Sequence, residues 1–285
     1  MPGPLTVTLE TTAGPTHVRV WPARAEYAAR GPVLLALHGW TDDGGVFGPL
    51  AEALDRRWTL LAPDAPAHGG TPWRPAQEYL VGSQLGHAVA ILDALPRVAG
   101  QRRAAVVLGH SMGALTAARV AAARPEAVRQ LVLEDPAHTG RRPSRSAARW
   151  RAWLRDLRAL SHEQLVARCA QENPTWPEDE RDPWARSKED LDLAHLDVPV
   201  DWGEPLAELL PEVRCPVLLV HGSAERGGIV TPTAARRCAR ACPAGCEVVR
   251  LDAGHNPRRD ARVAYVTTLV SILSSHSAPV TAAAS

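Results

Sequence analysis

The sequence predicts an α/β protein in which a mainly parallel, buried sheet is flanked by helices and interrupted by one helical insertion. Short apolar runs alternate with helix-forming segments through most of the chain, which is the pattern of successive strand and helix units. The alternation stops after Pro136 and resumes at Val213. With 285 residues, of which 45% are hydrophobic and 22% charged, the chain can bury one large core and still carry an insertion.

Five apolar runs are expected to be the core strands, because they are short and almost free of polar residues, as strands covered on both faces are. They span residues 33–37, 60–62, 104–108, 131–133 and 217–220. Helices are expected over residues 81–95 and 114–123. The second helix should end at Arg124, because Pro125 disfavours helical geometry in the residue before it.

The insertion is expected to be a helical lid. From Pro136 to about Pro211 the chain is rich in Arg, Glu, Pro and Trp, with helical stretches around residues 145–160 and 163–171 and no convincing strand. The expected organisation is a first core part over residues 1–136, a lid or cap over 137–212, a second core part over 213–275 and a flexible tail over 276–285.

Composition restricts the expected partners and compartment. Lys and Arg number 32 against 31 Asp and Glu, so no net field favours nucleic acid or an anionic membrane. No basic segment precedes a long apolar run at the start of the chain, and no run approaches the roughly 20 apolar residues that span a bilayer. We therefore expect a soluble cytoplasmic protein, either a monomer or a homodimer.

The five cysteines are expected to be reduced thiols that pack as small hydrophobic side chains. A metal site formed by Cys238, Cys242 and Cys246, which recur every four residues, is the alternative.

The strongest local motif is Gly109-His110-Ser111-Met112-Gly113, which follows an expected strand and precedes an expected helix. In that context the motif predicts a serine nucleophile on a sharp strand-to-helix turn. Such a turn strains the serine backbone, and the two glycines let the crossing chains approach closely. The free N–H groups at the helix N-terminus then favour negative charge that develops beside the hydroxyl.

At this motif the chain resembles the α/β-hydrolase superfamily, and the resemblance covers nearly the whole chain outside the lid. His38-Gly39-Trp40 is similar to the HG-x loop that follows an early core strand in the family. The segment Asp64-Ala65-Pro66-Ala67-His68-Gly69 is similar to another family segment, although Ala67 stands where glycine is usual. The resemblance implies that the oxyanion hole is made by the backbone amides of Trp40 and Met112, with structural roles for His38 and His68.

A serine hydroxyl needs a neighbouring base at neutral pH, most often a histidine. Ala253-Gly254-His255-Asn256 follows the apolar run 247–251, and the family carries its histidine on the loop after the last strand. The resemblance therefore implies that His255 is the base. His110 is not expected to act as the base, because neighbours at such a turn point in different directions.

Two acids compete to be the third member of the triad. Most of the superfamily carries the acid three residues beyond a glycine after the penultimate strand, a position that Glu225 occupies after Gly222. A minority, including haloalkane dehalogenases and zearalenone-type lactonases, carries it one strand earlier, where Asp135 lies 24 residues after Ser111. Both acids preserve the chain order of nucleophile, acid and histidine. We favour Asp135, because Arg226-Gly227-Gly228 is an unusual continuation after Glu225.

The predicted reaction is hydrolysis of a carboxylic ester or lactone with a bulky hydrophobic group, through an acyl-enzyme intermediate that a water activated by His255 then cleaves. This chemistry requires no metal and no organic cofactor, and none is predicted. A C–C bond hydrolase and a thioesterase use the same machinery and remain alternatives. A non-catalytic ligand-binding or receptor protein on the same fold is the alternative of a different class.

Aromatic and basic residues of the lid suggest what it binds. Large rings above a nucleophile suit a sizeable apolar or aromatic substrate group, and packing of the lid onto the core is the competing explanation. The lid tryptophans are Trp150, Trp153, Trp176, Trp184 and Trp202. A run of basic residues in the lid is expected to be a face exposed to solvent. The alternative is that this run binds an anionic partner, such as an acyl-carrier domain or a CoA tail. The run comprises Arg141, Arg142, Arg145, Arg149, Arg151, Arg155 and Arg158.

Overall fold

The structure is a computed structural model of the chain, and it describes residues 3–28, 33–73, 79–80, 82–98, 105–137 and 147–275. Several predictions made from the sequence lie outside these residues. They are the flexible tail over 276–285, the first residues of two predicted elements, at 81 and 104, and the arginines at positions 141, 142 and 145.

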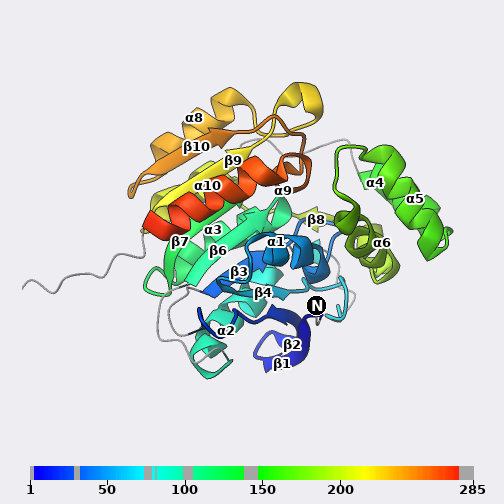
Figure 1. The fold of residues 1–285 in the computed structure, drawn as a ribbon, viewed down its shortest axis with the longest axis horizontal. Helices are drawn as coiled ribbons and strands as arrows, with labels where there is room; N and C mark the ends of the chain where they lie inside the picture. The colour runs from blue at the N-terminus through cyan, green and yellow to red at the C-terminus, as the bar shows by residue number, and fades with distance from the viewer. Residues whose placement is uncertain are drawn as a thin grey trace, which may run out of the picture.

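An eight-stranded sheet forms the centre of the molecule, in the order β1-β2-β4-β3-β6-β7-β9-β10 (Figure 1). Its strands are β1 (Leu5–Thr11), β2 (Gly14–Trp21), β3 (Val33–Leu37), β4 (Thr59–Pro63), β6 (Ala105–His110), β7 (Val128–Glu134), β9 (Val217–His221) and β10 (Cys246–Arg250). All pairs from β4 to β10 are parallel, whereas β1 pairs with β2 and β2 with β4 in antiparallel fashion. The prediction of a mainly parallel sheet is therefore confirmed.

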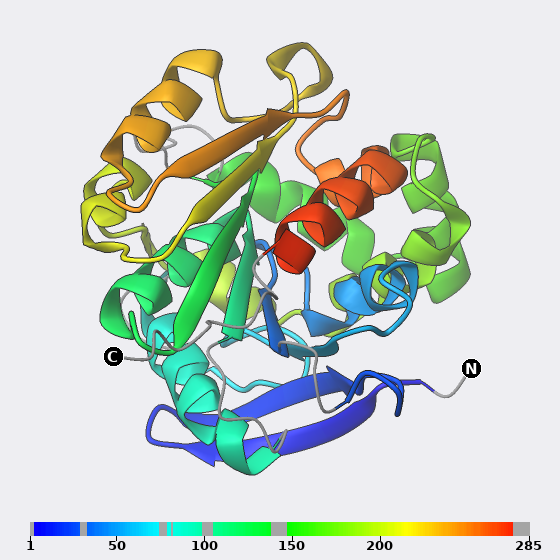
Figure 2. The same ribbon diagram turned by 60° about the vertical axis from the view of Figure 1, so that its left-hand side comes forward.

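Helices cover both faces of this sheet (Figures 1 and 2). In β3, Val33, Leu35 and Leu37 belong to one hydrophobic cluster while Leu34 and Ala36 belong to the other, because successive side chains of a strand point to opposite faces. The first cluster includes side chains of α2 (Ser83–Val98), α3 (Met112–Ala123), α7 (Leu206–Leu209) and α8 (Pro232–Ala241). The second includes side chains of α1 (Gly48–Ala53) and α10 (Arg262–Ser275).

A group of helices lies beside one end of the sheet (Figure 1). We call residues 147–212 the cap segment. Its main helices are α4 (Ala147–Arg158), α5 (His162–Glu172) and α6 (Arg181–Glu189), and it also holds the short turns η2 (Glu178–Glu180), η3 (Leu193–Asp197) and η4 (Leu210–Glu212) with α7. Leu157, Leu165 and Trp184 pack these helices together in a small core of their own.

The structure corrects two expectations. The insertion does hold a strand: β8 (Val200–Asp201) pairs with β5 (Tyr79–Leu80) in a separate two-stranded sheet. Two residues are too few to produce a recognisable periodicity. The N-terminal hairpin β1–β2 was not predicted either. Residues 5–11 alternate apolar and polar side chains, as a half-exposed edge strand does, but they form no unbroken apolar run of the kind used to predict the core strands.

The described cysteines are all free, and the described residues contain no group of three or more His, Cys, Asp or Glu side chains arranged to hold a metal ion. Among the helices that the structure describes, none combines the length and the apolar character needed to cross a bilayer.

Candidate active site

Ser111 lies at the turn between the central strand β6 and the helix α3, with φ 53° and ψ −112°. This region of backbone conformation is strained for any residue except glycine. The neighbouring glycines are required by close backbone approach: a Cβ on Gly109 would lie 2.2 Å from the Gly113 carbonyl oxygen, and one on Gly113 would lie 2.2 Å from that of Leu37. The turn is thus as tight as the motif predicts.

His255 and Asp135 complete a linear arrangement with the serine. The Nε2 atom of His255 is 3.0 Å from Ser111 Oγ, and its Nδ1 atom is 2.7 Å from Asp135 Oδ2. An ionised carboxylate can only accept, so Nδ1 carries the proton and Nε2 keeps the lone pair that faces the hydroxyl. The ring is therefore oriented to accept a proton from Ser111.

Of the two candidate acids, Asp135 lies against the ring and Glu225 does not. Asp135 is fully buried at the end of β7, and its carboxylate also accepts hydrogen bonds from the amides of Ile229 (2.9 Å) and Val230 (3.3 Å). Glu225 is exposed in the turn η5 (Ala224–Arg226), where hydrogen bonds from its own amide and from Ser223 lower its pKa. The loop where most of the family carries its acid here supplies N–H donors to Asp135 instead.

Of the two residues whose amides are expected to form the oxyanion hole, Met112 follows the serine in the chain and Trp40 follows a glycine that lies beside it in space. Met112 is the first residue of α3, and Trp40 follows the loop at Gly39, where a Cβ would lie 3.3 Å from that of Ser111. Within the described part of the chain, neither the Trp40 nor the Met112 amide donates a hydrogen bond to another backbone group.

Ser111 and His255 open into a cavity of about 420 Å³ between the core and the cap segment. All five tryptophans singled out in the sequence line it: Trp150, Trp153, Trp176, Trp184 and Trp202. Trp150 is 48% exposed, whereas Trp176 and Trp184 are buried. A polar part of the wall, which includes Asp42, Asn173 and Arg259, adjoins this aromatic part. The volume matches the range of small-molecule sites.

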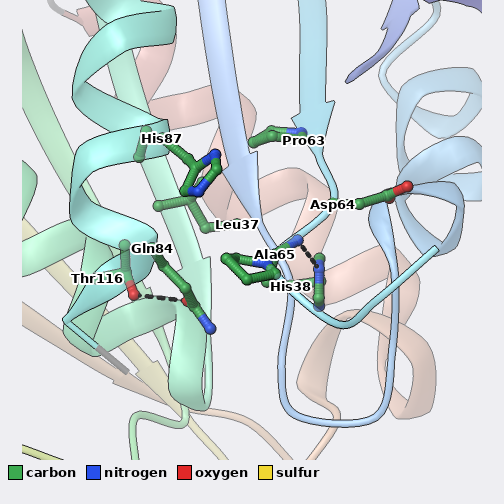
Figure 3. Close-up of a pocket in the computed structure, with 10 residues that line it drawn as sticks. Leu37, His38, Pro63, Asp64, Ala65, Gln84, His87 and Thr116 are labelled. Atoms are coloured by element: carbon green, nitrogen blue, oxygen red, sulfur yellow. Dashed lines mark hydrogen bonds between the residues drawn. The ribbon is translucent and has the colours of Figure 1, made fainter. Parts of the chain in front are cut away.

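A second cavity is lined by His38, Asp64, Gln84 and Thr116 among others, and it measures about 20 Å³ (Figure 3). It has room for about one water molecule, so it cannot hold a substrate. His38 donates from Nδ1 to the Gly39 carbonyl and accepts at Nε2 from the Ala65 amide, both within 2.9 Å. Burial lowers the pKa of His38 below its ordinary value, which keeps this ring neutral. These contacts suit the structural role expected for it.

His68 is also buried and neutral. It donates from Nδ1 to the Pro66 carbonyl and accepts at Nε2 from the Thr41 amide, while burial, followed by the nearby rings of His38 and His195, holds its pKa well below the ordinary value. Ala67, the residue that replaces the usual glycine, has φ 70°, a conformation that glycine adopts without strain.

Sequence reasoning missed several residues that hold the base loop, residues 253–257. His110 donates from Nε2 to the His255 carbonyl (2.9 Å), so its ring lies beside the base instead of pointing away. Burial, and then the nearby His255, holds the pKa of His110 well below its ordinary value. The only signal in the sequence was its place beside the nucleophile.

Two carboxylates fix the same loop. Asp260 accepts from the Gly254 amide (2.7 Å) with one oxygen and from Thr175 and the Trp176 indole, both in the cap segment, with the other. Glu134, next to Asp135, accepts from the amide and the guanidinium of Arg258. Apart from the contact between Asp260 and Gly254, which are six residues apart, the partners are distant in the chain, so no local sequence pattern predicts these pairings.

The fold and the arrangement of this site are those of the α/β-hydrolase fold. The chain matches the alpha/beta hydrolase fold family over residues 32–257, and it belongs to that family.

The curated relatives match this chain over only part of its length, and the solved structure matches it at low sequence identity. The chain is 38% identical over 112 residues to lipase LipV of Mycobacterium tuberculosis, covering 39% of this chain and 40% of that protein. It is 39% identical over 108 residues to a pimeloyl-(acyl-carrier protein) methyl ester esterase of Xylella fastidiosa, covering 38% of each. The chain thus spans about two fifths of the length of these curated relatives. The solved structure of N-formylmaleamic acid deformylase from Pseudomonas putida superposes with a TM-score of 0.74 at 20% identity, over 93% of this chain and 100% of that one, a likeness of fold alone.

Proposed function

We propose that the protein is a serine hydrolase that cleaves a carboxylic ester or lactone with a bulky hydrophobic group through an acyl-enzyme intermediate. The observation that carries the proposal is the continuous chain of contacts from Asp135 through His255 to Ser111, with distances of 2.7 and 3.0 Å. In this proposal Ser111 attacks the acyl carbonyl, His255 takes the hydroxyl proton and passes it to the leaving group, and Asp135 stabilises the imidazolium.

The oxyanion that forms during attack is assigned to the amides of Trp40 and Met112. Two preorganised N–H donors are each worth roughly 3 kcal/mol of barrier in acyl transfer. A water molecule, deprotonated by His255, then attacks the acyl carbon and releases the acid, so that Ser111 regains its proton. Both acylation and hydrolysis of the acyl-enzyme are thus carried out by side chains and backbone amides of this protein together with one water molecule.

The tryptophans of the cavity support the choice of a bulky apolar acyl or alcohol group. Aromatic rings bury a large area at a small cost in side-chain entropy. The test is a screen of p-nitrophenyl esters, lactones, thioesters and vinylogous diketo acids, with Ser111→Ala as the blank. The proposal predicts that ester or lactone turnover disappears in the blank. If only the diketo acids are turned over, the protein is a C–C bond hydrolase and not an esterase. If none of these substrate classes is turned over, a non-catalytic binding protein is favoured.

A thioesterase is the second candidate, and the exposed arginines of α4 favour it. Arg149, Arg155 and Arg158 are exposed residues of the helix that also carries Trp150, a residue of the cavity wall, and a basic surface on this helix suits an anionic carrier. The relative from Xylella fastidiosa also has an acyl-carrier protein in its name. A thioesterase would cleave a CoA thioester faster than the uncharged N-acetylcysteamine thioester of the same acid, and salt would remove the difference. Equal rates at low salt would exclude recognition of an anionic carrier by these arginines, and absence of cleavage of both thioesters would exclude a thioesterase.

A further inference from the structure

One buried lysine of the cap segment contacts the loop that carries Trp40. We call residues 38–43 the oxyanion loop. Lys188, in α6, is 1% exposed, and its Nζ atom lies 2.6 Å from the Thr41 carbonyl oxygen, 2.8 Å from Asp42 Oδ1 and 3.0 Å from Ser187 Oγ. An ammonium has three donors, so these three oxygens account for all of them. Two of the three belong to the oxyanion loop.

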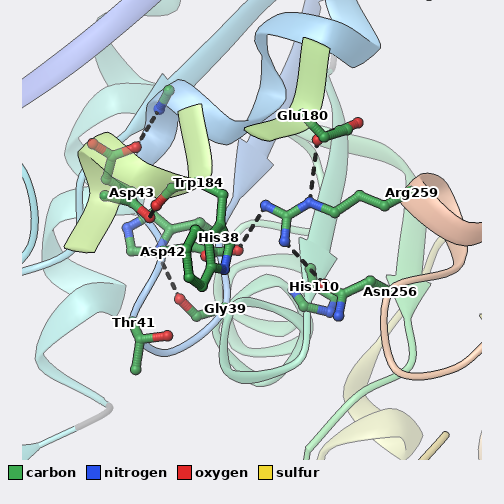
Figure 4. A network of polar contacts seen from close by, with 12 residues as sticks. His38, Gly39, Thr41, Asp42, Asp43, His110, Glu180, Trp184, Asn256 and Arg259 are labelled. Atoms are coloured by element: carbon green, nitrogen blue, oxygen red, sulfur yellow. Dashed lines mark hydrogen bonds and ion pairs between the residues drawn. The ribbon is translucent and has the colours of Figure 1, made fainter. Parts of the chain in front are cut away.

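Asp42 joins this lysine to the loop of the base through Arg259; Figure 4 shows the contacts that Arg259 makes with Asp42, Glu180 and Asn256. The second oxygen of Asp42 accepts from Arg259 at 3.0 Å, and Arg259 also donates to Glu180 of the cap segment (3.2 Å) and to Asn256 (3.2 Å). Burial by itself raises the pKa of Asp42, but the Arg259 and Lys188 charges outweigh it and hold the pKa well below the ordinary value. An ionised carboxylate therefore connects three segments: the oxyanion loop, the cap and the stretch that follows His255.

The oxyanion loop needs such support because its backbone is strained. Thr41 has φ 74°, a left-handed conformation that is a genuine outlier for a β-branched residue and persists only where the surroundings enforce it. Its amide faces His68 Nε2 at 3.4 Å and its carbonyl accepts from Lys188, so both of its polar backbone groups have partners. If Thr41 relaxed, the preceding residue, Trp40, would move with it.

We propose that Asp42 and Lys188 form a positioning pair, through which the cap segment fixes the Trp40 amide relative to Ser111. The inference rests on the proposed function, in which that amide stabilises the oxyanion. Asp42 also lines the cavity, whereas Lys188 does not; the role proposed for the pair is exerted through the backbone of Thr41 and Trp40. In this view the cap segment completes the catalytic site in addition to enclosing it.

The kinetic test uses Asp42→Asn, Lys188→Met and the double variant, with rates divided by the concentration of Ser111 titrated by a fluorophosphonate. We expect kcat to fall about 10- to 100-fold while KM changes by less than about threefold, because a displaced oxyanion donor affects the transition state more than the bound substrate. The double variant should lose no more than the worse single variant, since both changes break one unit. Asp197→Asn is the control, because it removes an exposed ion pair of the cap segment, to Arg155 at 3.0 Å.

Amide hydrogen exchange supplies a readout that does not depend on activity. Exchange at residues 39–43 should be faster in Asp42→Asn and in Lys188→Met than in the wild type or in Asp197→Asn. In Asp42→Asn the buried charges of Lys188 and Arg259 lose their carboxylate partner, which can prevent folding. In that case Lys188→Met alone tests the pair. If the wild type neither hydrolyses esters nor reacts at Ser111, the proposed function fails, and exchange still tests the pair.

Two results would overturn the positioning pair. One is an unchanged kcat per titrated serine, accompanied only by a lower melting temperature, which would make Asp42 and Lys188 ordinary stabilising residues. The other is unaltered exchange in the oxyanion loop of both single variants.

Discussion

The two ring nitrogens of His255 have different partners, and this difference sets the chemistry available to Ser111. Nδ1 faces a buried carboxylate and Nε2 faces the hydroxyl, so one tautomer is selected. The amides of Ile229 and Val230 also bind Asp135 and keep the carboxylate in place. Loss of the carboxylate charge should therefore affect the tautomer and the stabilisation of the imidazolium together.

Asp135→Asn is predicted to reduce kcat by about 10⁴-fold, because the amide cannot hold the productive tautomer or stabilise imidazolium. Glu225→Gln is the matched control and should leave kcat unchanged, since Glu225 is exposed and lies away from the ring. Steady-state kinetics on an ester substrate, at equal concentrations of folded enzyme, compare the two. A larger loss in Glu225→Gln than in Asp135→Asn would reverse the assignment.

The sequence was sufficient to propose Ser111 and His255, because each lies in a short local motif next to an apolar strand. It favoured Asp135 over Glu225 only because of the unusual continuation after Glu225, since both acids fit the spacing of the family. The choice depends on how the loop after β9 folds, with Gly227 at φ 92° and its amides turned toward Asp135. The pairing of Asp42 with Lys188 could not be predicted from the sequence either, because the two residues are 146 positions apart in the chain.

At the scale of secondary structure, the turn between β6 and α3 depends on two residues without side chains. The central strand, the turn and the helix were all predicted from apolar runs and helix formers, whereas the short strands β5 and β8 are too short to show a periodicity. The edge strand β1 does alternate apolar and polar residues, but a search for unbroken apolar runs does not detect that pattern.

Gly109→Ala is predicted to lower the free energy of unfolding by about 3 kcal/mol, because its methyl group would overlap the backbone of Gly113 and rigid backbone cannot yield. Gly82→Ala is the control, since a methyl group there meets no atom within 4 Å. Urea unfolding of both variants measures the difference. Equal stability of the two would show that the turn is looser than described.

The helices of the cap segment present tryptophans to the cavity, and Trp150 can be changed at little structural cost because it is half-exposed. Trp150→Ala is predicted to reduce kcat/KM about 10-fold for esters of bulky aromatic acids and hardly at all for acetates, as apolar contact is lost only with the large group. The neighbouring exposed residue gives the control, Arg149→Ala. A uniform loss across all esters would contradict a role in selecting the substrate.

For the molecule as a whole, buried neutral histidines make stability depend on pH. Burial lowers the pKa of His38, His68 and His110 below the ordinary value. The unfolded chain therefore binds protons below about pH 6.5 that the folded protein does not, so this contribution is complete above that pH and declines as the pH falls. Burial also raises the pKa of Asp43 to about 6 and that of Glu134, and these two groups act in the opposite direction.

The histidines outnumber the opposing carboxylates, since His87 and His195 also have lowered pKa values, chiefly because of burial. The free energy of unfolding should therefore decrease by about 1.4 kcal/mol or more per pH unit between pH 6 and pH 5. Urea unfolding at pH 7, 6 and 5 measures it. A free energy of unfolding that stays constant or increases as the pH falls from 7 to 5 would show that the buried histidines are protonated in the folded protein.

The central claim is that His255 and Asp135 activate Ser111 for attack, and covalent labelling tests it most directly. Intact mass and peptide mapping after treatment with a fluorophosphonate should show one adduct, on Ser111, in the wild-type protein. The adduct should be missing in Ser111→Ala and should form at least about 100-fold more slowly in His255→Ala. A folded wild-type protein that stays unlabelled at Ser111, or that reacts equally fast without the His255 imidazole, would contradict the account.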